Sequence, residues 1–270
     1  MDSAPYHHWK GPDETIWATF HRADKVYLVR FPELADFEIA SDGMSVDCHP
    51  VLGTSEETVQ HLYTNQVLPL AMSMMGKLVF HGSAIEVDNH AVAFLAESGR
   101  GKSTLAASFA VNGSRFLTDD GLVLDPTSTG YQAHPGDPSI RLWMDSEREL
   151  ITPGTLAAPA LPYTSKSRFL AEPSISFCGQ PRPLSRVYFL GDGSSETIVF
   201  GSMIESEALV EFAKHSFLLD IEKRSLLSTH FDMLAKLVNQ FVPYRLDFPR
   251  RFDFLERVRE TIIEHLLNGE

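Results

Sequence analysis

The chain has few cysteines and a deficit of positive charge, and each scarcity excludes a class of protein. Its 270 residues contain two cysteines, Cys48 and Cys178, which stand far apart in the sequence. They provide neither a disulfide framework nor a cysteine-based metal site. The 23 Lys and Arg face 36 Asp and Glu, which gives a formal net charge of -13. Nucleic acids and anionic membranes are bound by clustered basic residues, so we expect neither as a partner.

Long apolar runs are also missing. No stretch reaches the roughly 20 apolar residues that cross a bilayer. The first residues, MDSAPYHHWKGPDE, are polar and acidic, unlike a secretory signal. Together with the scarcity of cysteine, these features predict a cytoplasmic protein.

The pattern of secondary structure predicts an α/β chain in two parts. Residues 1–53 contain short β-prone stretches at 17–20, 26–31 and 37–40, which indicate an N-terminal β-rich segment packed on the core. Residues 54–270 are expected to form one larger domain, which begins with a helix from Ser55 to about Met75. Further elements are predicted in this larger domain: strands at 186–190 and 244–248, and helices near 204–213, 226–241 and 252–267.

A hairpin lies at the centre of the larger domain. Residues 78–87 (LVFHGSAIEV) are predicted to form one strand, and residues 91–95 (AVAFL) a second, buried one. Asp88 and Asn89 leave room only for a tight turn, so the two strands must be antiparallel neighbours. If Val87 faces His90, counting back along the pair places His81 opposite Ala96.

The stretch Ala96-Glu97-Ser98-Gly99-Arg100-Gly101-Lys102-Ser103-Thr104 follows the second strand. It matches the phosphate-loop template, Gly-x4-Gly-Lys-Ser/Thr, except that Ala96 replaces the first glycine. The residues expected to contact nucleotide phosphates are Ser98, Gly99, Arg100, Gly101, Lys102, Ser103 and Thr104. Lys102 would reach the β- and γ-phosphates, and the Ser103 hydroxyl would ligate Mg²⁺. The alternative is a glycine-rich turn that caps an ordinary helix, but the strand before and the helix after favour the phosphate loop.

Two adjacent acids, Asp119 and Asp120, end the next predicted strand, 115–117, which residues 122–124 are expected to continue. One carboxylate suits Mg²⁺ and the other the proton of an attacking hydroxyl. Asp119 is favoured as the base and Asp120 as the metal ligand, although the residues alone do not fix the order. A solvated Asp-Asp-Gly turn is the alternative.

Several other side chains are candidates for the same site. His81 is predicted to lie beside the loop, where it would polarise a catalytic carboxylate or contact the transferred phosphoryl group; the alternative is a packed core histidine. Ser83, two positions after His81, lies on the same face of the strand as His81, and a purely structural role is its alternative. Three cations, Arg141, Lys166 and Arg168, are candidates to offset transition-state charge or bind substrate, with solvated surface charge as the alternative. Arg250 and Arg251 are expected on the surface.

Three stretches, HGSAIEV, AVAFLAESGRGKST and FLTDDGLVL, resemble the catalytic core of bacterial HPr kinase/phosphorylase and its smaller relatives. The likeness continues more loosely through SIRLW, TSKSRF, VYFL and YRLDFPRRFDFLERV, and so spans roughly residues 54–265. It implies a P-loop kinase core of the HPr kinase and phosphoenolpyruvate carboxykinase type, with a mixed central sheet. Residues 1–53 would then be a β-rich appendage to an HPr-kinase-like catalytic domain, 54–270.

The resemblance also implies roles for individual residues. Lys102 and Ser103 would act on phosphates and Mg²⁺, Asp119 and Asp120 would be the catalytic carboxylates, and His81 would lie close to them. The chain departs from the family at Ala96, and also at Thr104, where the bifunctional enzymes often have Glu. No segment matches the one associated with dephosphorylation.

The short layout is similar to HPr-kinase-like enzymes that phosphorylate lasso peptide precursors. The resemblance therefore implies an ATP- and Mg²⁺-dependent serine kinase with a peptide or small protein as acceptor. Two alternatives stay open: a kinase for free serine, and a nucleotide-binding regulator without turnover. The acceptor, the reverse activity and assembly into a homo-oligomer are not determined by the residues.

Overall fold

The computed structural model describes residues 4–11 and 14–268, which form two compact units. Of the described residues, the first unit comprises 4–11, 14–77 and 217–226, and the second comprises 78–216 and 227–268. The helical segment that follows residue 54 therefore belongs to the first unit. None of the described helices is both long enough and apolar enough to cross a membrane.

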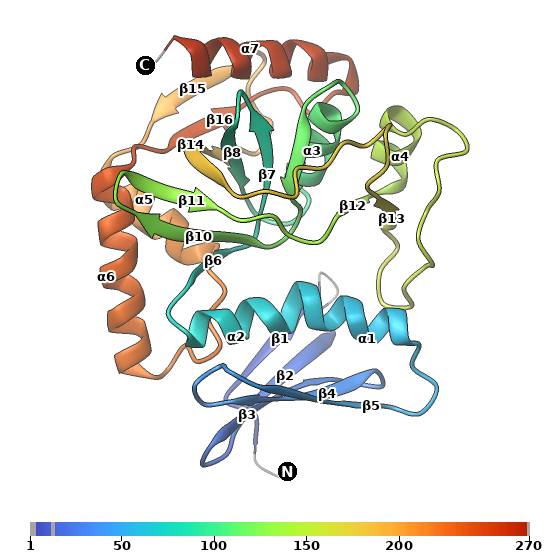
Figure 1. Cartoon of the computed structure of the whole chain (residues 1–270), viewed down its shortest axis with the longest axis vertical. Coiled ribbons are helices and arrows are strands. Elements are labelled where there is room, and N and C mark those ends of the chain that lie inside the picture. Colours follow the sequence, from blue (N-terminus) through green and yellow to red (C-terminus); the bar gives the residue numbers. More distant parts are fainter. Residues whose placement is uncertain (1–3, 12–13, 269–270) are drawn as a thin grey trace. The chain divides into compact units, whose positions relative to one another are not determined.

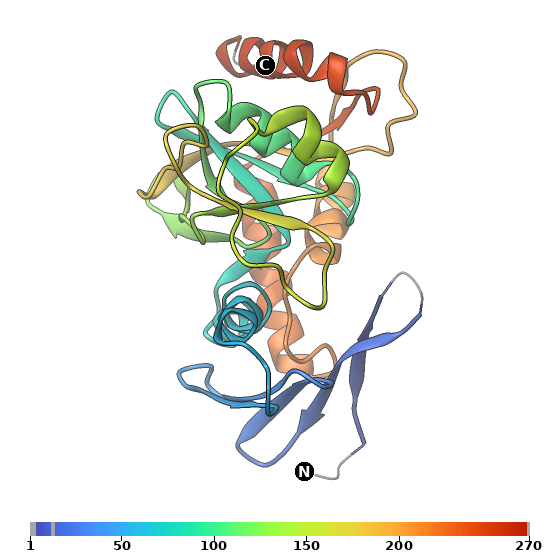
Figure 2. The ribbon, with the colours of Figure 1, turned by 90° about the vertical axis from the view of Figure 1, so that its right-hand side faces the viewer.

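An antiparallel meander of five strands forms the sheet of the first unit (Figures 1 and 2). The strands are β1 (His7–Lys10), β2 (Ile16–Arg22), β3 (Val26–Phe31), β4 (Ala35–Ala40) and β5 (Val46–Pro50). In β4 every second residue is buried, as expected when one sheet face is covered. The predicted β-rich character of this segment is confirmed.

A helical segment accompanies this sheet. It consists of α1 (Glu56–Leu62), a π-helical turn (Tyr63–Val67) and α2 (Leu68–Met74). Ser55 caps α1, because its side chain accepts a hydrogen bond from the backbone amide of Thr58. The predicted helix is present, with a π-helical turn that the apolar spacing did not indicate.

The second unit contains a nine-stranded mixed sheet. Its strands are β6 (Leu78–Phe80), β7 (Gly82–Val87), β8 (His90–Leu95), β9 (Arg115–Thr118), β10 (Leu122–Thr127), β11 (Gly130–Ala133), β14 (Arg182–Leu190), β15 (Val199–Ser202) and β16 (Tyr244–Asp247). Strand β14 runs parallel to β8 and β16, and the other pairs are antiparallel. A separate pair consists of β12 (Ser139–Leu142) and β13 (Ser167–Leu170).

Helices cover both faces of the mixed sheet. The helices are α3 (Lys102–Ala110), α4 (Met144–Leu150), α5 (Glu205–Lys214), α6 (Arg224–Gln240), a 3-10 turn (Phe252–Phe254) and α7 (Leu255–Leu267). Along β8, Val92 and Phe94 pack into a core with α3 and α7, whereas Ala93 and Leu95 pack into a second core with α5 and α6. This alternation explains why the strand is apolar throughout. Figures 1 and 2 both show α7 next to α3.

The register of the central hairpin is as predicted. Val87 pairs with His90 and Gly82 with Leu95, which places His81 opposite Ala96. Gly82 is required there, since a Cβ atom would lie 2.5 Å from the Leu95 side chain.

Two predicted strands are wrong in detail. The stretch 78–87 is broken at His81, whose amide donates to the carbonyl of His215, so β6 leaves β7 and pairs with β10. Likewise, residues 122–124 do not continue the preceding strand. The backbone of Asp120 has φ = +75°, which turns the chain from β9, paired with β7, into β10, paired with β6.

Candidate active site

The predicted phosphate loop connects the end of β8 directly to the first residue of α3. Gly99 (φ = +81°) and Gly101 (φ = +85°) adopt left-handed conformations that favour glycine. The first amides of a helix have no partner within that helix, and the helix dipole adds positive potential at this end. Ser98, Gly99 and Gly101 line a cavity at this point. The backbone therefore has the form of an anion-binding loop.

Lys102 lies at the base of this loop and is almost completely buried. Its Nζ donates to the carbonyl oxygens of Ala96 at 2.7 Å and Glu97 at 3.1 Å. Burial lowers the pKa of Lys102 to about 8, against the opposing influence of Asp120 and Asp119. The ammonium group is thus mainly charged at neutral pH, and the loop's own carbonyls hold it where phosphate oxygens would compete for it.

Strand register places Asp119 beside the loop. Ala84 of β7 pairs with Thr118, the last residue of β9, so Ser83 and the following Asp119 come together. Asp119 Oδ1 accepts hydrogen bonds from the hydroxyls of Ser83 (2.6 Å) and Ser103 (2.9 Å), and Oδ2 accepts one from the amide of Arg141 (3.0 Å). Burial, followed by the neighbouring Asp120 carboxylate, raises the pKa of Asp119.

Asp120 faces the cavity instead. Its left-handed backbone turns its side chain away from that of Asp119, and its carboxylate accepts a hydrogen bond from Arg141 Nη2. Burial opposes ionisation of Asp120, but Arg141, His81 and Lys166 outweigh it and hold the pKa of this carboxyl well below its usual range. Asp120 is therefore an ionised carboxylate at the wall of the cavity.

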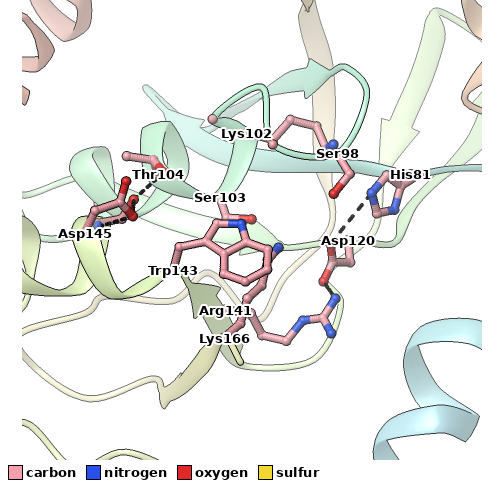
Figure 3. Close-up of a pocket in the computed structure, with 13 residues that line it drawn as sticks. His81, Ser98, Lys102, Ser103, Thr104, Asp120, Arg141, Trp143, Asp145 and Lys166 are labelled. Carbon is pink, nitrogen blue, oxygen red and sulfur yellow. Dashed lines mark hydrogen bonds and ion pairs between the residues drawn. The ribbon is translucent and has the colours of Figure 1, made fainter. Parts of the chain in front are cut away.

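Arg141 contacts Oδ2 of Asp120, and His81 lies near the other carboxylate oxygen, with 4.0 Å between His81 Nε2 and Asp120 Oδ1. Burial of the ring, then the charge of Lys102, lowers the pKa of His81 to about 4, although a third of the side chain remains accessible. The imidazole is consequently neutral at neutral pH. Figure 3 shows Asp120 between His81 and Arg141.

The cavity gathers most of the predicted site residues. Those that line it are His81, Ser98, Gly99, Gly101, Lys102, Ser103, Thr104, Asp120, Arg141 and Lys166. Asp119 is buried and is not among the residues that line the cavity. Arg100 points elsewhere, toward the carbonyl of Asp192 and the side chain of Glu97, and Arg168 lies opposite Arg141 on β13, outside the cavity.

Three further lining residues were not anticipated: Trp143, Asp145 and Ser146. The Lys166 ammonium lies 5.4 Å from the centre of the Trp143 ring, and the hydroxyls of Ser146 and Thr104 are 2.9 Å apart. The place of Trp143, two residues after Arg141 in the sequence, was the available signal for this residue. Asp145 and Ser146 have no such signal, because their position depends on how α4 packs beside α3.

The donor set at this cavity fits Mg²⁺. In the described ranges, no group of three or more His, Cys, Asp and Glu is arranged to hold a metal by itself. Mg²⁺ is commonly bound by one or two carboxylates, with waters and substrate phosphates completing its shell. The Ser103 hydroxyl and the oxygens of Asp119 and Asp120 are hard ligands of this kind, so a nucleotide-bound Mg²⁺ is compatible with the site.

Comparisons with known proteins find matches among solved structures. No protein-family model matches the chain, and no curated protein matches it significantly. Among solved structures, it is similar to the Hpr(Ser) kinase/phosphatase from Coxiella burnetii, with 10% sequence identity and a TM-score of 0.39. The match covers 70% of this chain and 97% of that one. At this sequence identity and TM-score, the match does not establish the activity of the chain, which has to be inferred from the cavity itself.

Proposed function

We propose that the chain is an ATP- and Mg²⁺-dependent kinase that transfers the γ-phosphate to a serine hydroxyl of a peptide or small protein. One observation carries this proposal: the cavity that contains the phosphate loop and Lys102 also contains an ionised Asp120 beside a neutral His81. A site that merely held nucleotide would need the loop and a cation. A buried, ionised carboxylate near the terminal phosphate is what phosphoryl transfer to a hydroxyl needs in addition.

The geometry suggests exchanging the roles expected for the two acids. Asp119 accepts a hydrogen bond from the Ser103 hydroxyl, whose oxygen lone pairs then remain available to a metal ion. In phosphate-loop enzymes, the Ser or Thr of the loop and an acid at a strand end hold Mg²⁺ together. When bound, Mg²⁺ would neutralise charge on the phosphate oxygens. We therefore assign Ser103 and Asp119 to the metal side and Asp120 to the acceptor side.

Transfer would proceed by in-line displacement. The acceptor hydroxyl donates a hydrogen bond to Asp120, which orients it, its oxygen forms a bond to the γ-phosphorus, and its proton passes to an oxygen of the transferred phosphoryl group. The bond from the γ-phosphorus to the β,γ-bridging oxygen breaks, and ADP leaves with that electron pair. Lys102, Arg141 and Lys166 surround this position and would stabilise the negative charge that develops. The neutral His81 can donate one hydrogen bond to a phosphoryl oxygen.

Mass spectrometry tests the reaction class and the acceptor together. Wild-type protein with Mg-ATP is incubated separately with a serine-containing lasso peptide precursor, HPr protein and free serine. One added phosphate on the precursor or on HPr supports the proposal, and Lys102→Ala should abolish it. Phosphate on free serine alone would identify a small-molecule kinase. ATP binding without transfer to any acceptor would favour a nucleotide-binding regulator.

A further inference from the structure

A second cavity adjoins the phosphate cavity at the N-terminal end of α3. The two share Gly99, Gly101, Thr104, Asp145 and Ser146 as lining residues. The rest of the second cavity comes from the segment that joins β16 to α7. The contributing side chains are Phe248, Arg250, Arg251, Phe252 and Leu255.

The walls of the two cavities differ in chemistry. The phosphate cavity is lined by ammonium, guanidinium, carboxylate and hydroxyl groups, whereas two phenylalanines and a leucine line the second. Its two arginines add flat, weakly hydrated guanidinium surfaces. Aromatic rings and guanidinium planes are the surfaces on which nucleic-acid bases stack.

Arg250 forms a fixed part of this wall, contrary to its expected place on the surface. Its guanidinium carbon lies 4.1 Å from the centre of the Phe248 ring, and its Nη2 donates to the Gly191 carbonyl at 2.8 Å. Gly193 makes room for it, because a Cβ there would lie 2.4 Å from the arginine side chain. Within the described residues, Nε and Nη1 of Arg250 are buried without a hydrogen-bond partner. Arg251 is largely exposed, as expected.

The order of residues along the loop gives the nucleotide a direction. Lys102 and Asp120 line the phosphate cavity and not the second one, so the terminal phosphate belongs at that end. Thr104 follows Ser103 and lines both cavities. A phosphate chain that starts at Lys102 and passes over the helix N-terminus therefore leads past Thr104 toward Phe248 and Phe252.

We propose that the second cavity is the subsite for the nucleoside of the bound nucleotide, with the base against Phe252 and the two arginines. This inference rests on the proposed kinase function, which supplies the nucleotide. A third cavity, on the side of the loop formed by Ala96 and Arg100, is a poorer candidate. Four carboxylates line it, from Glu97, Asp192, Glu211 and Asp247, and Thr104 does not.

Calorimetry with two ligands separates the nucleoside from the phosphates. The full chain is titrated with Mg-ATP and with the Mg²⁺ complex of inorganic tripolyphosphate, which lacks base and ribose. Wild type should bind ATP more tightly than tripolyphosphate. Phe252→Ala should raise the Kd for ATP by about tenfold, the effect expected for one lost stacking contact, and leave that for tripolyphosphate unchanged. Phe252→Leu keeps apolar volume but removes the ring, so its Kd for ATP should lie between those of wild type and Phe252→Ala.

Two controls make the outcome decisive. Lys214→Ala alters the third cavity and should change neither affinity, whereas Lys102→Ala should weaken both ligands. The subsite is overturned if Phe252→Ala and Phe252→Leu affect both ligands equally or neither, or if Lys214→Ala selectively weakens ATP. Equal affinity of wild type for the two ligands also overturns it while leaving the phosphate loop in place. Failure of wild type to bind either ligand removes the proposed function and the subsite together.

Discussion

The Ser103 hydroxyl donates a 2.9 Å hydrogen bond to Oδ1 of Asp119, and this contact joins the phosphate loop to the paired acids on the neighbouring strand. Asp119 is held from three directions, by Ser83, Ser103 and the amide of Arg141. Asp120, one residue later, faces the cavity. Two carboxylates adjacent in sequence thus have different surroundings, and different consequences follow from changing each.

Asparagine substitutions should separate the two acids. Asp120→Asn should leave the Kd for Mg-ATP within about threefold of wild type and lower the rate of transfer by about 10²-fold or more, as expected when the carboxylate that orients the acceptor hydroxyl is lost. Asp119→Asn should weaken Mg-ATP binding by about tenfold, because the metal side loses its negative charge and an NH2 donor replaces one of the two acceptor oxygens. Calorimetry and single-turnover transfer measure the two effects. The opposite pattern, with binding lost in Asp120→Asn, would restore Asp119 as the base.

Nucleotide affinity should fall at alkaline pH because Lys102 loses its charge. The pKa of this lysine in the nucleotide-free protein is about 8, below its ordinary value, through burial. Below pH 8 the ammonium is already charged and affinity should be nearly flat. Above pH 8 the Kd for Mg-ATP should rise by up to about tenfold per pH unit, since phosphate binds the charged form. Calorimetry from pH 7 to 9.5 gives the profile. Lys102→Arg, which stays charged, should bind more weakly but without this alkaline loss.

Mild acid should destabilise the protein in part through His81. Its pKa is about 4 in the folded chain, mainly through burial, and 6.5 is the ordinary value for histidine. Between these values the unfolded chain binds more protons than the folded one, so the free energy of unfolding falls as pH falls from 6.5 to 4. Urea unfolding at pH 7.5 and pH 5 should show a smaller loss for His81→Gln than for wild type. An identical loss in both proteins would show that His81 makes no contribution.

Asp220 should be important for the stability of the first unit. This buried carboxylate is bound by the guanidinium of Arg22 and, at 3.0 Å, by the hydroxyl of Tyr27, and so ties residues 217–226 to strands β2 and β3. Asp220→Ala should lower the free energy of unfolding by up to about 3 kcal/mol, because it removes the acceptor of the Tyr27 hydroxyl and leaves Arg22 with Glu222 as its remaining partner. Glu222→Ala, which removes the exposed partner of Arg22, should cost less than about 1 kcal/mol. Urea titrations of both variants give the comparison, and equal costs would contradict the role given to Asp220.

Local chemistry made part of the site predictable. The Asp88-Asn89 turn permits one antiparallel register, and that register brings His81 to the first residue of the loop. Glycines at 99 and 101, where the backbone requires positive φ, made the loop recognisable before its fold was known. The β-rich character of residues 1–53 also followed from local composition, although β1 and β5 were not among the predicted strands.

Other parts of the site depend on contacts between distant residues. Arg141 and Asp120 are 21 positions apart, and their pairing requires that β12 pack beside the loop helix. Arg250 enters a cavity wall because Gly193 makes room for it, which no pattern near Arg250 indicates. The break at His81 arises likewise from a backbone hydrogen bond to His215.

From the sequence one can predict the hairpin, a glycine-containing loop after it and two acids at a strand end, because short turns, glycine conformations and alternating apolar residues act over a few neighbouring positions. Tertiary structure alone decided which acid faces the cavity. Asp119 and Asp120 are chemically identical, and what distinguishes them is the left-handed turn of the chain at Asp120 and the distant donors around each. Ser83, Ser103 and the Arg141 amide bind Asp119, whereas the Arg141 guanidinium binds Asp120.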